Sequence, residues 1–148
     1  MAATRDHGEL QELFREVVTQ MAGSLAAFAN VIREGCPTAS QHQEAFAIAH
    51  SLHGSGKLYG FPSISELGAS LEKVTDALRE NRLPAGPTVA SLLDSCAEAL
   101  HRLSADGEPK EPLETRIRDL AWECECVLHA ARGGAAEPLP GNAAGQPA

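Results

Sequence analysis

The sequence predicts an all-α protein, an antiparallel up-down four-helix bundle with an additional C-terminal helix. Apolar residues recur at spacings of three and four along five segments of the chain, and this is the period of one helix face. Aromatic residues make up only 4% of the sequence, whereas leucine and alanine are abundant, which favours helices over strands. Short connections join the segments, so consecutive helices are expected to run antiparallel.

The first two helices are expected over residues 6–34 and from residue 38 or 40 to about Tyr59. Gly35 and Pro37 separate them. The apolar stripe of the first comprises Leu10, Leu13, Phe14, Val17, Met21, Leu25, Phe28 and Ile32. The buried side of the second would use Ala45, Ile48, Ala49, Leu52 and Leu58.

The third helix has the clearest expected start, because Ser63 and Glu66 form a capping-box pattern. Its seam residues are Ile64, Leu67, Leu71, Val74 and Leu78. A loop is expected over 81–87, a fourth helix over 88–104 and a fifth over 112–132. Residues 1–132 would form one helical domain, and the Gly-, Ala- and Pro-rich residues 133–148 a disordered tail.

Bulk properties exclude several function classes. The net charge of −8 argues against nucleic-acid or anionic-membrane binding through a basic surface. No apolar run approaches the roughly 20 residues that span a bilayer, and residues 1–9 do not resemble a secretory signal. We therefore expect a cytoplasmic protein whose four cysteines are reduced thiols.

A metal site is not expected from the cysteine-rich segment near the C-terminus. Cys124, Cys126 and His129 occur close together, but on a helix positions 124 and 126 point about 200° apart. The spacing does not match patterns that reliably mark zinc.

The most informative stretch surrounds His50. On a helix, His50, His53, Gly54 and Lys57 lie three, four and seven residues apart and so share one face. The His50 ring would project into solvent. Gly54 costs about 1 kcal/mol relative to alanine within a helix, and it would leave space for a phosphoryl group and a partner. His53 and Lys57 could donate hydrogen bonds to the phosphoryl oxygens.

This stretch resembles the signature of histidine-containing phosphotransfer (HPt) domains. That signature is His-x-Leu-Lys-Gly with small residues after it, a later glycine and a leucine-rich helix ending in Leu-Glu. Here it reads His50-Ser51-Leu52-His53-Gly54, then Gly60, then Leu71-Glu72. The run is also similar to the phosphoacceptor domain of bacterial chemotaxis kinases. The close match covers residues 49–72, and the helix pattern extends it over 10–103.

The resemblance implies a role for each residue of the motif. His50 would be the phosphorylated histidine, Gly54 would keep the site open, and Glu72 would bond the other ring nitrogen of His50. A carboxylate that accepts from Nδ1–H leaves the lone pair on Nε2 and raises the basicity of the ring. His53 departs from the family, because most members have lysine there, and a histidine is only partly charged near neutral pH. Lys57 is a candidate to compensate.

The implied function is that of a phosphoryl carrier, not an enzyme with its own ATP site. It would exchange a phosphoryl group with an aspartate on receiver domains of response regulators and hybrid histidine kinases. A receiver would bring its own Mg²⁺, so no cofactor is expected on this chain. Docking would use the His50 face with Phe46 and Ala47, and a monomer is expected.

Three other interpretations stay open. The chain could be a detached phosphoacceptor domain that an ATP-bound chemotaxis-type kinase domain phosphorylates directly, which the fifth helix and the tail favour. It could instead be a non-phosphorylated HPt-like adaptor or kinase inhibitor that keeps only the docking surface. A third idea is a metal site formed by His50 and His53 with Glu72 nearby.

Overall fold

The computed structural model describes residues 7–106 and 111–132, and every regular element in that part of the chain is helical. The five helices are α1 (His7–Glu34), α2 (Ala39–Gly56), α3 (Pro62–Arg79), α4 (Pro87–Asp106) and α5 (Glu111–Ala131). The all-α prediction is confirmed. The predicted tail over 133–148 lies outside the described residues.

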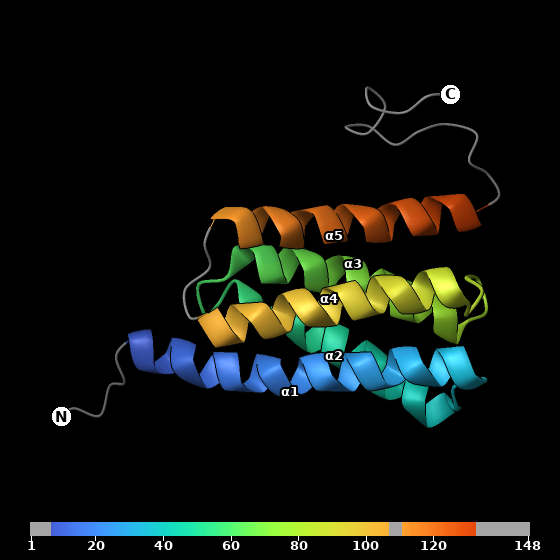
Figure 1. Cartoon of the computed structure of the whole chain (residues 1–148), viewed down its shortest axis with the longest axis horizontal. Coiled ribbons are helices and arrows are strands. Elements are labelled where there is room, and N and C mark those ends of the chain that lie inside the picture. The colour runs from blue at the N-terminus through green and yellow to red at the C-terminus, as the bar shows by residue number, and fades with distance from the viewer. Residues whose placement is uncertain (1–6, 107–110, 133–148) are drawn as a thin grey trace, which may run out of the picture.

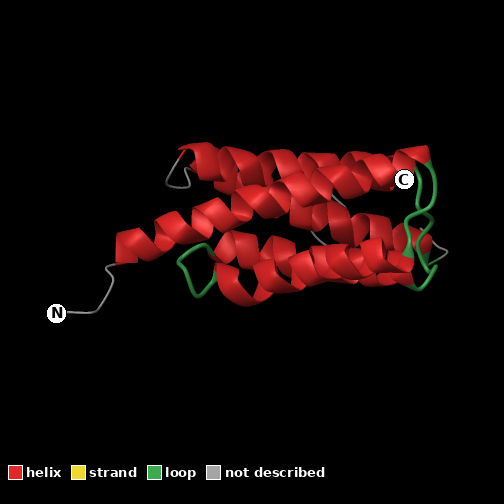
Figure 2. Cartoon of the chain, turned by 90° about the horizontal axis from the view of Figure 1, so that it is seen from below, coloured by secondary structure: helices red, strands yellow, loops and turns green. Residues whose placement is uncertain are grey.

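The helices lie side by side along one long axis (Figure 1). The closest pairs are α2 with α3 and α1 with α4, and α5 covers α3 and α4. The start of α1 extends beyond the other helices (Figure 2), although its Gln11 side chain still donates to the Tyr59 carbonyl at 3.1 Å. The expected four-helix bundle with a fifth helix against it is therefore present.

The α1 stripe is buried as predicted at Phe14, Leu25, Phe28 and Ile32. Leu13 and Val17 are exceptions, because their exposed fractions are 41% and 44%. Both residues line a shallow groove between α1 and α2. The apolar stripe is thus wider than the surface that the neighbouring helices cover.

The end of α2 differs from the prediction. The helix stops at Gly56 and a turn follows, so Leu58 is 73% exposed rather than buried. The turn closes where Gly60 takes φ 93°, a conformation that favours glycine. Phe61 then enters the core, with its ring 5.6 Å from that of Phe14.

The predicted capping box at the start of α3 is wrong. The helix begins at Pro62 with Phe61 as N-cap and no side-chain cap. Proline at the first position needs no N–H partner, and this leaves Ser63 buried in the core. A capping box occurs instead at α2, where Thr38 Oγ1 accepts from the Gln41 amide at 3.1 Å and Gln41 Oε1 accepts from the Thr38 amide at 2.8 Å.

The four cysteines differ in their exposure to solvent. All four cysteines are free, and Cys124 is buried whereas Cys126 is partly exposed. Hydrogen bonding to Cys96, followed by burial, raises the pKa of the Cys124 thiol. In the described part of the chain, no helix combines the length and apolar character needed to cross a membrane.

Candidate functional site

The site is built on a close contact between α2 and α3 that two glycines permit. A Cβ on Gly68 of α3 would lie 2.3 Å from the backbone nitrogen of His53. A Cβ on Gly56 of α2 would lie 2.6 Å from the backbone nitrogen of Ser65. The two backbones therefore touch along the last turns of α2, and a larger residue at either position would force them apart.

One side of α3 faces α2, from the buried backbone contact to the exposed surface. Ser65, Gly68 and Glu72 lie three and seven residues apart, so they share a helix face. The Ser65 hydroxyl donates to the His53 carbonyl at 2.7 Å, and this fixes the register between the helices. Glu72 consequently lies opposite the turn of α2 that carries His50 and His53.

The Glu72 carboxylate joins both histidines. Its Oε2 lies 2.9 Å from Nδ1 of His50, and its Oε1 lies 2.8 Å from Nδ1 of His53. The Glu72 side chain is 23% exposed, compared with 70% for His50 and 50% for His53. The carboxylate thus sits beneath two rings that project outward.

The hydrogen bond from His50 is the largest influence on Glu72 and lowers its pKa, with burial opposing and His53 adding a further decrease. The carboxylate is therefore ionised at neutral pH and can only accept hydrogen bonds. Each Nδ1 then carries the hydrogen, so the lone pair of each neutral ring lies on Nε2.

The surroundings of His50 leave its ring accessible. A Cβ on Gly54 would meet no heavy atom within 4 Å, so this glycine opens space one turn along. On the preceding turn, the Phe46 ring lies nearly parallel to the His50 ring with centroids 6.2 Å apart. The Arg79 guanidinium covers Phe46 at 4.6 Å, so Phe46 is half-buried while Ala47 is exposed.

Comparison with protein families agrees with this geometry. The family model described as Hpt domain matches residues 6–104, which covers α1 to α4 almost completely. The chain belongs to the Hpt domain family. No curated protein matches the chain. Membership places this Hpt domain in histidine phosphotransfer within phosphorelays, where such domains interact with receiver domains.

The Hpt motif residues that the sequence singled out come together at one place, with one exception. His50, His53 and Glu72 are in contact, and Gly54 lies beside them on α2. Lys57 lies in the turn after α2, and within the described residues it makes no hydrogen bond or ion pair with either histidine or with Glu72. Its predicted role beside the phosphate stays a prediction.

Sequence reasoning missed the second half of this cluster. It expected Glu72 to bond His50 and assigned His53 only to the phosphate. It also gave no role to Ser65 or Gly68, which set the register. A signal was present: two small residues one turn apart, followed by a glutamate, face the glycine-rich end of α2.

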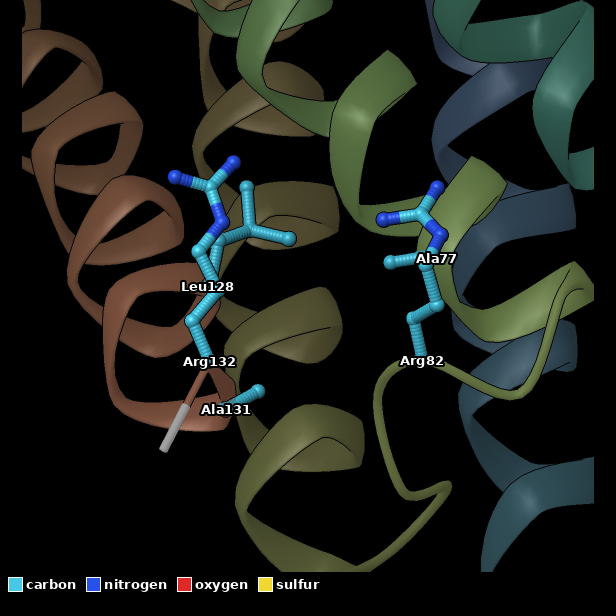
Figure 3. Close-up of a pocket in the computed structure, with 5 residues that line it drawn as sticks. All are labelled: Ala77, Arg82, Leu128, Ala131 and Arg132. Atoms are coloured by element: carbon cyan, nitrogen blue, oxygen red, sulfur yellow. The ribbon is translucent and has the colours of Figure 1, made fainter. Parts of the chain in front are cut away.

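Other features of this Hpt domain lie away from His50. A hollow of about 450 Å³ between α3 and α5 is lined by Ala77, Arg82, Leu128, Ala131 and Arg132 (Figure 3). Arg82 already pairs there with Asp76 and Glu80. Among the described residues, no group of three or more His, Cys, Asp or Glu side chains could hold a metal ion, so the alternative with His50, His53 and Glu72 finds no support.

Proposed function

We propose that this chain is a phosphoryl carrier that accepts a phosphoryl group on His50 and exchanges it with an aspartate of a receiver domain. One observation carries the proposal. His50 is a largely exposed imidazole whose Nδ1 is held by an ionised carboxylate, while the glycine one turn away opens space on the same face.

The chemistry follows from this arrangement. The lone pair on Nε2 of neutral His50 attacks the phosphorus of the acyl phosphate. An N–P bond forms as the P–O bond to the partner's aspartate breaks, and the aspartate leaves as a carboxylate. His50 keeps its Nδ1 proton, so the phosphorylated ring is positively charged and Glu72 balances that charge. The reverse step regenerates the neutral ring.

A docking surface for the receiver adjoins His50. A groove of about 200 Å³ runs between α1 and α2, and Ser51 and Ser55 line its α2 side next to His50 and Gly54. Leu13 and Val17 are exposed at its α1 side. A receiver that reaches His50 would cover these apolar side chains, which adds to the expected contacts at Phe46 and Ala47. The receiver would supply Mg²⁺ and the aspartate, so the proposal assigns no ATP site or cofactor to this chain.

Transfer from a phosphorylated receiver domain tests the proposal. We expect the wild-type chain to take up acid-labile phosphate, His50→Gln to take up none above background, and both to unfold at similar denaturant concentrations. His101→Gln is the matched control, because it removes an exposed imidazole from α4 and should accept phosphate normally. Normal labelling of His50→Gln would overturn the assignment.

Direct phosphorylation by a kinase domain is the second candidate. It is favoured by α5, which packs against α3 and α4 although it lies beyond the residues matched by the family model. Incubation with a chemotaxis-type kinase domain and ATP, without a receiver, separates the two. Labelling under those conditions supports direct phosphorylation, whereas labelling only by a receiver supports the relay.

A further inference from the structure

The backbone of His53 is fixed by two contacts with α3. Its carbonyl accepts from Ser65, and its backbone nitrogen lies where a Cβ on Gly68 would approach within 2.3 Å. Its side chain therefore starts from a fixed point relative to α3. From that point its Nδ1 reaches Glu72 Oε1 at 2.8 Å, which is the oxygen that His50 leaves unused.

We propose that His53 acts on the phosphoryl group directly, beside His50, and that one extra proton shared by this histidine pair sets the rate of phosphoryl transfer. Transfer would be fastest when His53 is protonated and His50 is neutral. This inference rests on the proposed function, since it assumes that His50 is the phosphoacceptor. It concerns the position where the family resemblance leads one to expect lysine.

The shared carboxylate couples the two rings. Both Nδ1 atoms contact the Glu72 carboxylate, so an extra proton on one ring makes it harder to protonate the other. When the two rings together carry one proton more than their neutral forms, that positive charge cancels the negative charge of Glu72. When that proton is on His53, its ring keeps the ion pair with Glu72, and its outward N–H can donate to phosphoryl oxygens. His50 then keeps its Nε2 lone pair for attack.

Few other charges reach the pair. From α3, Glu72 faces the pair, and the permanently charged Arg79 lies over the Phe46 ring that stacks beside His50. Ser65 and Gly68, which touch the His53 backbone, are uncharged. From α1, the residues that line the adjoining groove are apolar. Along α2 and its turn, the remaining charged neighbour is Lys57, one turn beyond His53. The protonation state of His53 is therefore the main variable charge beside the phosphoryl group.

The expected consequence is a bell-shaped dependence of rate on pH. At the acidic end a second extra proton occupies His50 and removes its lone pair. At the alkaline end the pair loses its extra proton, and the cation beside the phosphoryl group is lost. A lysine at position 53 would keep its charge to about pH 10. The rate of such a variant would therefore rise with pH as His50 loses its proton, and would not fall again below about pH 10.

Phosphorylation by phosphoramidate, with release of ammonia, tests this without a partner protein. Rates are compared for wild type, His53→Lys and His53→Gln from about pH 5.5 to 9. The ratio of wild-type to His53→Lys rate cancels the donor's own titration. We expect the ratio to fall about tenfold between pH 6.5 and 8.5, and the wild-type rate should approach the low rate of His53→Gln at the upper end of this range.

A constant ratio across this range, or equal rates for His53→Lys and His53→Gln, would overturn the inference, as would phosphate on His53 itself. Failure of wild type to accept any phosphate would instead count against the proposed function. An NMR titration of both rings in the wild-type chain does not depend on the variants folding. We expect coupled titration of the two rings that Glu72→Gln separates, and independent titrations in wild type would contradict the sharing of a proton.

Discussion

The two ends of α2 carry histidines in opposite states. Near the start, His42 is half-buried, and its Nδ1 is buried without a hydrogen-bond partner in the described part of the chain. Its ring lies edge-on to Phe28 at 5.7 Å, and burial, followed by repulsion from Arg79, lowers its pKa. Two turns later, His50 is exposed and Glu72 holds its Nδ1.

The difference lies in what α3 places opposite each histidine. Because α3 runs antiparallel to α2, its last turn brings a cation, Arg79, near His42, and its middle brings a carboxylate near His50. The residue type is the same and the helix is the same. The residue of α3 that faces each imidazole and the burial of its ring make the difference. His42 fills space in the fold, whereas His50 has the geometry of a nucleophile.

Spacing between α2 and α3 should be the most sensitive feature at the His50 end. Gly68→Ala should lower the free energy of unfolding by about 1–3 kcal/mol, since its Cβ would press on the His53 backbone. It should also reduce phosphoryl acceptance, because Glu72 moves with α3. Gly54→Ala should be neutral or stabilise by up to about 1 kcal/mol, since nothing lies within 4 Å. Urea unfolding of both variants measures this, and equal effects would contradict the account.

Removal of the charge on Glu72 should weaken the chemistry and leave the bundle intact. Glu72→Gln keeps the size of the side chain but no longer balances the charge of a phosphorylated His50. We expect the transfer rate to fall about 10–100-fold, the range found when the hydrogen-bond partner of a metal-bound histidine is lost. Glu66→Gln, which removes an exposed carboxylate from the same helix, is the control. A wild-type rate for Glu72→Gln would show that the contact has no chemical role.

The start of α2 should respond in stability alone. Thr38→Ala removes the hydroxyl that accepts from the Gln41 amide and should cost about 1 kcal/mol in unfolding free energy. Glu66→Ala, which alters the capping-box pattern predicted for α3, should change stability by less than about 0.5 kcal/mol, since α3 has no side-chain cap. Thermal or urea unfolding measures both losses of stability. A larger loss for Glu66→Ala than for Thr38→Ala would contradict the helix starts described above.

His42 should produce the smallest and most specific effect, a dependence on pH. Its lowered pKa in the fold means that the unfolded chain, with an ordinary value near 6.5, binds the proton more readily. The contribution of neutral His42 to stability is complete above the pKa of the unfolded chain. It declines as the pH falls from that pKa to the lower pKa of the folded chain. His42→Phe should flatten the decline in unfolding free energy between about pH 7.5 and 5.5, and an unchanged slope would contradict this assignment.

Much of the fold could be predicted because it depends on local patterns. The helix periodicity located all five helices, and helix geometry placed His50 and Gly54 on one face. The errors arose where tertiary structure overrides a local pattern. Leu58 follows the apolar spacing but lies in a turn, and Ser63 fits a cap but is buried one residue after Pro62.

The site was only half predictable for the same reason. The resemblance to HPt domains supplied Glu72 as a partner of His50. The contact between Glu72 and His53 depends on the register of α2 against α3, which the backbone contacts at Gly56 and Gly68 and the Ser65 hydroxyl determine. No periodicity within one helix contains that information.

Mapping the phosphate on wild-type protein is the most direct test of the central claim. The chain would be phosphorylated by a receiver domain, and the phosphate located by fragmentation mass spectrometry and by NMR of the imidazole nitrogens. We expect one acid-labile, base-stable phosphate on Nε2 of His50, with Nδ1 still protonated. Phosphate on Nδ1 or on another residue, or receiver binding without any phosphate, would contradict the account.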